Sequence, residues 1–290
     1  MESALRRAFA GVGVSGPAIE STSRSGDERL LVERALGDGA TTIVVVGGDG
    51  TWSKAARAIL NSGADCRLGL IAAGTGNDFA KSVGVPAGDF AASARLAVDG
   101  PDARVDVGRV EDEWFLNAVG FGFDVAVLEN AARVGWLSGN LLYAYVALQQ
   151  LLRYRGLKIT CDALEGTTGA RQLLLVIANG RCFGGAFQIA PNASLGDGLL
   201  DMISIPDASS LERLRLFIRA TRGRHVMLPS VVTRQSRSFA LEFESPPVYD
   251  LDGELRYARS STIDIECVPS ALRVVGARTV GTSWNTKKAK

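Results

Sequence analysis

Two glycine-rich turns are the parts of this chain best suited to bind phosphate. One follows the apolar run 41–46 and reads GGDGT at 47–51; the other follows the run 68–71 and reads GTGND at 74–78. A β-branched run that ends in glycines predicts a buried parallel strand that enters a tight turn. Glycine lets the backbone come close to a ligand, and the free N–H groups at the start of the next helix attract an anion.

Each turn carries a threonine whose hydroxyl can donate to phosphate, Thr51 in the first and Thr75 in the second. Asp49 would repel phosphate, so we expect its carboxylate to face a cation or a hydrogen-bond donor. One glycine-rich turn alone is weak support for phosphate binding, because many such turns only connect a strand to a helix. Neither turn matches the P-loop or the dinucleotide-binding pattern, so the residues alone leave the ligand open.

A series of motifs resembles those of the diacylglycerol kinase-type lipid kinases, in the order in which that family has them. After the glycine turns they read FLNAVGFGFD, ANGRCFGG, IAP, DGLLD and DGE, at 115–124, 178–185, 189–191, 197–201 and 252–254. The chain is therefore identified as a member of the diacylglycerol kinase catalytic family, in its soluble bacterial branch. Membership implies an ATP- and Mg²⁺-dependent kinase that phosphorylates a lipid hydroxyl, first of all that of diacylglycerol, to give phosphatidic acid.

The resemblance implies which residues bind the nucleotide. Most of them lie in and directly after the first glycine turn: Gly47, Gly48, Asp49, Gly50, Thr51, Trp52 and Ser53. Thr75 in the second turn and Thr22, in a T-x-x-x-G-D run, would add contacts. For Thr22, a threonine that merely ends a strand is an equally good interpretation.

The resemblance also implies the catalytic and metal-binding residues. Glu254 matches the general base, which would take the proton of the lipid hydroxyl during phosphoryl transfer. Without the resemblance, the sequence of 249–255 predicts only an acidic hairpin turn with no function. Asp49 and Asp124 are candidates to hold the Mg²⁺ that accompanies ATP, since this ion prefers oxygen ligands. A second, structural magnesium would be held by one carboxylate and two backbone carbonyls, those of Asp197, Ser194 and Leu199.

Two departures from the family pattern keep other hypotheses open. The family begins with a strand and an N-P-x-[SA]-G turn that this sequence lacks, so we expect the native reading frame to begin upstream of Met1. After GGDGT, the family's usual Asn-Glu is Ser53-Lys54, and Lys54 reverses a charge. A catalytically impaired lipid-binding regulator is therefore one alternative. A soluble-substrate kinase of the NAD kinase type is another, although 178–185 and 197–201 argue against it.

The composition is that of a globular protein. Of its 290 residues, 47% are hydrophobic and 22% are charged, and the net charge is +1. This balance argues against a dedicated nucleic-acid binder. The four cysteines lack metal-ligand spacing, and a lone histidine, His225, argues against a histidine-based zinc site. The N-terminus has no apolar signal core, so we expect a cytoplasmic protein.

The pattern of elements changes near residue 102. Over 1–102, strands and helices alternate, which predicts a nucleotide-binding α/β domain with a helix-covered parallel sheet. Over 103–280, strand-like runs dominate, which predicts an antiparallel, sandwich-like β domain for the lipid substrate, followed by a tail at 281–290. The family has this architecture, with its active site in the cleft between the domains. The elements we predict include a strand at 18–22, a helix from Asp27 to Gly37, strands at 114–119, 262–267 and 272–275, and helices at 134–152 and 209–222.

A lipid substrate lies in a membrane, so we expect the protein to associate with the membrane surface during turnover. Segment 134–152 approaches the length of a membrane span, but polar residues interrupt it, and we interpret it as a buried or substrate-facing helix. Segment 209–224 interleaves apolar residues with arginines, as a helix on an anionic surface does. A helix packed on the sheet with a solvated arginine face explains this segment slightly better. The sequence leaves a homodimer open.

Overall fold

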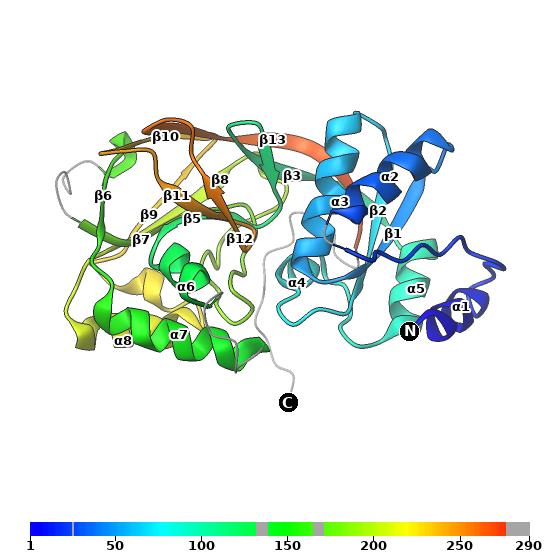
Figure 1. The fold of residues 1–290 in the computed structure, drawn as a ribbon, viewed down its shortest axis with the longest axis horizontal. Helices are drawn as coiled ribbons and strands as arrows, with labels where there is room; N and C mark the ends of the chain where they lie inside the picture. Colours follow the sequence, from blue (N-terminus) through cyan, green and yellow to red (C-terminus); the bar gives the residue numbers. More distant parts are fainter. Residues whose placement is uncertain (25, 132–138, 165–170, 277–290) are drawn as a thin grey trace.

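A computed structural model of the chain shows two lobes that are joined by long strands (Figure 1). It describes residues 1–24, 26–131, 139–164 and 171–276, and of 139–144 and 152 it describes the backbone alone. The first lobe holds the N-terminal helices around a small parallel sheet. The second holds most of the strands, with helices gathered on one side of them (Figure 1).

The first lobe is a parallel sheet with helices around it. In this sheet, β2 (Arg67–Ala72) pairs in parallel with β1 (Thr42–Gly47) and with the end of β13 (Thr262–Val275). The helices are α1 (Glu2–Ala10), α2 (Asp27–Gly37), α3 (Asp49–Ser62), α4 (Asp78–Val83) and α5 (Phe90–Asp99). Helix α3 packs against α2 and β1, and α1 packs against α5. The predicted helix-covered parallel sheet is confirmed.

The short strand predicted at 18–22 is wrong, because these residues form neither helix nor strand. The run has one large apolar side chain, Ile19, which packs into a cluster with residues of α1, α5 and the sheet. A single apolar residue gives no alternating face that could be placed on a sheet. The next prediction is correct, since α2 runs from Asp27 to Gly37.

The second lobe is built from antiparallel strands, as predicted. Its strands are β3 (Asp102–Val110), β4 (Glu113–Phe115), β5 (Ala118–Gly122), β6 (Leu157–Thr160), β7 (Arg171–Ala178), β8 (Leu200–Pro206), β9 (Val232–Ser236), β10 (Ser238–Phe243), β11 (Val248–Leu251) and β12 (Glu254–Tyr257). Its helices are α6 (Phe123–Ala131), α7 (Gly139–Arg153) and α8 (Ser210–Ala220). Strand β7 is buried along almost its whole length, whereas β10 alternates exposed and buried residues and has one face toward water.

Two strands run from one lobe to the other. Strand β13 pairs with β3 in antiparallel fashion along most of its length and with β2 at its end. It replaces the two separate strands predicted at 262–267 and 272–275, because a register shift between Val268 and Leu272 interrupts the pattern without ending the strand. Conversely, the strand predicted at 114–119 divides into β4 and β5, which pair with different partners. The domain boundary near 102 stays a prediction, and it falls at the first residue of β3.

Two other predictions fall partly or wholly beyond the described residues. The helix predicted at 134–152 is described from Gly139, where α7 begins. The tail at 281–290 lies outside the described residues.

Candidate functional site

The two glycine turns lie against each other at the carboxyl ends of β1 and β2. The Ala73 N–H donates to the Gly47 carbonyl oxygen at 2.8 Å. A Cβ added to Gly74 would lie 2.5 Å from the Gly48 Cα, and one added to Gly47 would lie 2.8 Å from the Thr51 hydroxyl oxygen. Because only glycine tolerates so close an approach, contact between the turns accounts for Gly74, and contact with Thr51 of the same turn accounts for Gly47, even without a ligand.

Asp49, the first residue of α3, points at the start of α4. Its Oδ1 accepts the Phe79 N–H at 3.1 Å, so the carboxylate faces a hydrogen-bond donor, as its sequence position predicted. Burial raises the pKa of Asp49, and the negative charge of Asp78 adds to this shift. The same helix start is tied to the second lobe, because Asp78 Oδ2 accepts the Gly185 N–H at 2.8 Å and Lys81 bridges the same two residues.

The residues predicted to bind the nucleotide differ in how far solvent reaches them. Thr75 is exposed and 47–51 are half-buried, so both turns are accessible. The Trp52 side chain is fully buried, and its indole N–H donates to the Val45 carbonyl oxygen at 3.3 Å, which leaves only its backbone for a nucleotide. Thr22 is exposed in the segment that precedes α2. Their role in nucleotide binding stays a prediction.

Asp252, in the turn between β11 and β12, ties the two lobes together. Its buried carboxylate accepts four hydrogen bonds at 2.7–3.1 Å, from the Ser53 hydroxyl and from the backbone N–H groups of Leu116, Asn117 and Ala118. Ser53 was predicted to line the nucleotide, but its hydroxyl donates to Asp252 in this structure. Sequence reasoning missed Asp252, because an aspartate before a glycine is what any tight turn contains.

Glu254, the predicted general base, begins β12 and faces α3. Its carboxylate meets three cations, at 3.1 Å from Lys54, 3.4 Å from Arg57 and 2.8 Å from Arg256. Partial burial acts to raise the pKa of Glu254, but the hydrogen bonds and charges of Arg256 and Lys54 outweigh it and lower the pKa below its usual value. The carboxylate is therefore ionised at neutral pH, which is the state that a general base requires.

Asp124, predicted to help hold Mg²⁺, lies in the first turn of α6 beside Asp250 of β11. Gly120, which pairs with Asp250, has no side chain and so leaves space for the Asp124 carboxylate. Both carboxylate oxygens of Asp124 are buried without a hydrogen-bond partner, and burial raises its pKa to about 7. Burial and the charge of Asp124 raise the pKa of Asp250 well above its usual value. The two carboxyl groups thus interact through charge, and the metal role of Asp124 stays a prediction.

Replacing Asp124 by asparagine is expected to stabilise the fold more at pH 8 than at pH 5. An acid whose pKa rises on folding stays protonated in the folded chain while the unfolded chain ionises, so stability falls as the pH rises toward 7. The neutral side chain removes that loss, which is worth about 2–4 kcal/mol above pH 7. Urea unfolding of parent and Asp124→Asn at both pH values measures the difference, and an equal difference at both values would contradict a raised pKa.

The segment 194–199, predicted to bind a structural magnesium through Asp197, is fixed by a neighbouring carboxylate. Asp197 Oδ1 accepts the Leu199 N–H at 3.1 Å. Asp106 of β3, which sequence reasoning missed, is buried and accepts the Gly198 N–H at 2.7 Å and an N–H of β13 at 2.8 Å. Across the part of the chain that the structure describes, no three His, Cys, Asp or Glu side chains gather as a metal site would. The set of Asp197 with the carbonyls of Ser194 and Leu199 stays a prediction.

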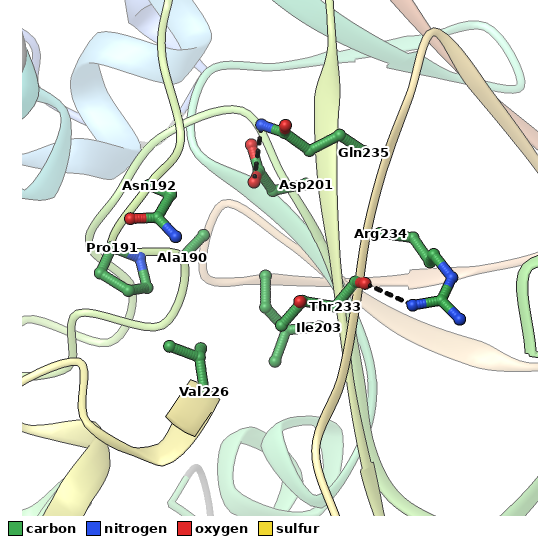
Figure 2. Close-up of a pocket in the computed structure, with 9 residues that line it drawn as sticks. All are labelled: Ala190, Pro191, Asn192, Asp201, Ile203, Val226, Thr233, Arg234 and Gln235. Carbon is green, nitrogen blue, oxygen red and sulfur yellow. Dashed lines mark hydrogen bonds between the residues drawn. The ribbon is translucent and has the colours of Figure 1, made fainter. Parts of the chain in front are cut away.

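A pocket of about 290 Å³ lies between the IAP segment and the strands β8 and β9, and Figure 2 shows its lining. Asp201, on β8, accepts a hydrogen bond from Gln235 at 3.1 Å through Oδ1, while its Oδ2 is buried without a partner. Burial is the main cause that raises the pKa of Asp201 to about 6. Neither Glu254 nor a glycine turn lines this pocket, so it is separate from the predicted catalytic residues.

The fold and the contacts between the lobes define a class of protein. Two glycine turns begin helices in a parallel α/β lobe, and an antiparallel β lobe presents the Glu254 carboxylate from a hairpin to Lys54 of one of these helices. Glycine turns at helix starts suit the phosphates of a nucleotide, and an ionised carboxylate suits an acceptor hydroxyl. This is the arrangement of a two-lobed phosphotransferase.

Comparison with known proteins identifies the family. The family model of the diacylglycerol kinase catalytic domain matches residues 5–110, and that of the YegS C-terminal NAD kinase beta sandwich-like domain matches residues 117–276. The chain is 36% identical over 259 residues to a protein of Mycobacterium tuberculosis (strain ATCC 25618 / H37Rv) named diacylglycerol kinase, across 87% of this chain and 82% of the relative. It therefore belongs to the diacylglycerol kinase catalytic family, and it is a lipid kinase.

Two further comparisons agree with this assignment. A protein of Klebsiella pneumoniae (strain 342) named "Probable lipid kinase YegS-like" is 31% identical over 260 residues, across 88% of this chain and 84% of the relative. The solved structure of a diacylglycerol kinase from Bacillus anthracis str. Sterne superposes with a TM-score of 0.69 at 18% identity, across 94% of this chain and 91% of that one. The last comparison supports the fold alone.

Proposed function

We propose that this lipid kinase transfers the γ-phosphoryl group of ATP to the hydroxyl of diacylglycerol and so forms phosphatidic acid. The observation that carries the proposal is the position of Glu254, which faces α3, the helix that begins at the first glycine turn. Relatives named diacylglycerol kinase support this choice of acceptor over other lipid alcohols.

The phosphates of ATP would lie at the start of α3, where the first N–H groups of the helix have no partner within it. Glu254 would accept the proton of the lipid hydroxyl while the oxygen of that hydroxyl forms its new bond to the γ-phosphorus. The bond from that phosphorus to the β–γ bridging oxygen breaks at the same time, and ADP leaves with the electron pair. Such a transfer depends mostly on positioning and charge neutralisation, so a base of lowered pKa suffices.

Asp49 fits a magnesium ion that accompanies ATP. Its Oδ1 accepts the Phe79 N–H, and its pKa is raised by burial first and by the negative charge of Asp78 second, a charge that a cation would balance. One carboxylate plus phosphate oxygens is a common way for proteins to hold Mg²⁺, which would neutralise charge on the phosphates. In the second lobe, Asp197 with two backbone carbonyls would hold the structural ion.

The proposed acceptor is tested with γ-labelled ATP and a panel of acceptors. We expect label in phosphatidic acid when vesicles contain diacylglycerol, and much less with sphingosine, ceramide, a polyprenol or phosphatidylglycerol. If another lipid carries the label, that lipid is the acceptor in place of diacylglycerol, and the assignment of the protein as a lipid kinase still holds. Label in NADP from added NAD, with none in any lipid, would contradict the proposal.

The lipid acceptor must be reached at a membrane surface, and α8 offers a face for this. Along α8, Leu211, Leu214 and Ile218 are 78%, 38% and 53% exposed, on the side opposite the buried Leu216. Arg215, next to Leu214, is also exposed, whereas Arg213 is buried and forms an ion pair with Asp207. No helix in the described part of the chain is long and apolar enough to cross a membrane. An amphipathic helix with apolar and basic residues suits a position in the headgroup layer.

Replacing Leu211 and Ile218 by glutamate is expected to weaken binding to anionic vesicles by about tenfold, because each change removes apolar area and adds repulsion. Sedimentation with vesicles of phosphatidylglycerol and phosphatidylcholine measures the binding. The matched control is Leu30→Glu, which changes a leucine of similar exposure (52%) on α2 in the first lobe. Equal loss of binding in control and double variant would exclude α8 as the membrane-facing helix.

A further inference from the structure

Lys54 stands where the family pattern has a glutamate, and its side chain reaches from one lobe to the other. Its Nζ lies 3.1 Å from Glu254 Oε1, and the two side chains are only 25% and 27% exposed. Partial shielding from water strengthens an ion pair relative to one on an open surface. A residue of α3 that departs from the family thus contacts the predicted base.

The other two cations at Glu254 are each fixed by further partners. Arg57 donates to a backbone carbonyl of β4 at 2.8 Å, and Arg256 donates to one of its own strand at 3.1 Å. Both arginines also lie 3.7 Å from Glu113, so two carboxylates share them. They meet Glu254 at Oε2, whereas Lys54 meets it at Oε1. Lys54 therefore orients the carboxylate oxygen that the arginines do not contact.

The position of Lys54 in α3 relates this contact to the phosphates. Lys54 follows Asp49, the first residue of the helix, by about 7–8 Å along the axis, at 1.5 Å per residue. The contact between Lys54 and Glu254 therefore lies within about two helical turns of the phosphate-binding end of α3.

We propose that Lys54 is a positioning residue, which holds the Glu254 carboxylate ionised and directed at the phosphate-binding end of α3. This inference rests on the proposed role of Glu254 as the base. The charged or titratable groups that face Glu254 come from four elements and a turn: Lys54 and Arg57 of α3, Arg256 of β12, Glu113 of β4, Asp250 of β11 and Asp252 of the turn. Without Lys54, two arginines shared with Glu113 must balance the carboxylate.

The test compares Lys54→Met, Lys54→Glu and Lys54→Arg by kcat, by the KM for ATP, by melting temperature and by the pH profile of kcat/KM. In Lys54→Met, we expect the acid limb of the profile to move to higher pH by about 1 unit. We expect kcat at pH 7 to fall by about 5–10-fold, because the base is less well directed. In Lys54→Glu the limb should move further, and Lys54→Arg should restore the profile of the parent. The KM for ATP and the melting temperature should change little.

The control and a parallel variant separate the possible failures. Lys158→Met removes an exposed lysine of the second lobe, whose Nζ is 2.8 Å from Glu244, and should leave every readout as in the parent. Lys54→Met and Lys54→Glu could keep the pH profile and kcat of the parent while Glu254→Gln loses activity. The proposed positioning role of Lys54 would then be wrong, and the proposed role of Glu254 as the base would hold. If Glu254→Gln keeps the parent rate, the base and the inference about Lys54 fail together.

Discussion

Replacing Glu254 by glutamine is expected to lower kcat for lipid phosphorylation by a factor of about 10²–10⁴, the usual cost of losing a positioned base. Glutamine keeps the size and hydrogen-bonding reach of the side chain but cannot take the proton of the lipid hydroxyl. The affinity for ATP should survive, because the glycine turns belong to the other lobe. Steady-state rates on diacylglycerol vesicles, together with the KM for ATP and the melting temperature, measure the effect.

The control for this variant is Glu244→Gln, which changes an exposed glutamate whose partner is Lys158. Its rate should equal that of the parent. A Glu254→Gln protein within a few-fold of the parent rate would exclude Glu254 as the base. A variant that loses stability and ATP affinity together with rate would assign Glu254 a structural role between the lobes.

Replacing Asp252 by alanine is expected to lower the free energy of unfolding by about 3–5 kcal/mol. The change leaves four buried donors without their acceptor, one of them the Ser53 hydroxyl of the first lobe and three of them backbone N–H groups of 116–118. It also places alanine at a φ of +53°, where aspartate and asparagine are better tolerated. Urea unfolding followed by circular dichroism measures the loss.

Asp264→Ala is a matched control, because Asp264 is an exposed aspartate on β13. It should stay within about 0.5 kcal/mol of the parent. An Asp252→Ala protein as stable as this control would mean that the four hydrogen bonds contribute little to holding the lobes together.

Much of the fold could be predicted because local signals mark its elements. Helix α2 runs from Asp27 to Gly37, the bounds that the sequence predicts, because an aspartate precedes its apolar residues and a glycine follows them. Strand β9 was missed because three of its five residues, Thr233, Arg234 and Gln235, are polar and exposed at its place beside β8. Likewise, α6 was missed because it directly follows β5, without a turn that would separate the two in the sequence.

In the candidate site too, some features could be predicted from local sequence and others could not. The glycine turns could be predicted, since close backbone approach requires glycine and leaves a visible pattern at 47–51 and 74–78. The contacts of Glu254 with Lys54 and of Asp252 with Ser53 join residues about 200 positions apart, and no local pattern encodes them. The effect of Asp124 on the pKa of Asp250 depends on the register of β5 with β11, which places Gly120 opposite Asp250.

The measurement that tests the account most directly is a crystal structure of the chain with a non-hydrolysable ATP analogue and Mg²⁺. The account predicts phosphate oxygens at the first N–H groups of α3, with the γ-phosphate facing Glu254 across a gap that admits one hydroxyl group. The acceptor oxygen would then lie about 3 Å from the Glu254 carboxylate. Triphosphate bound away from 47–51, or a γ-phosphate that faces away from Glu254, would contradict it.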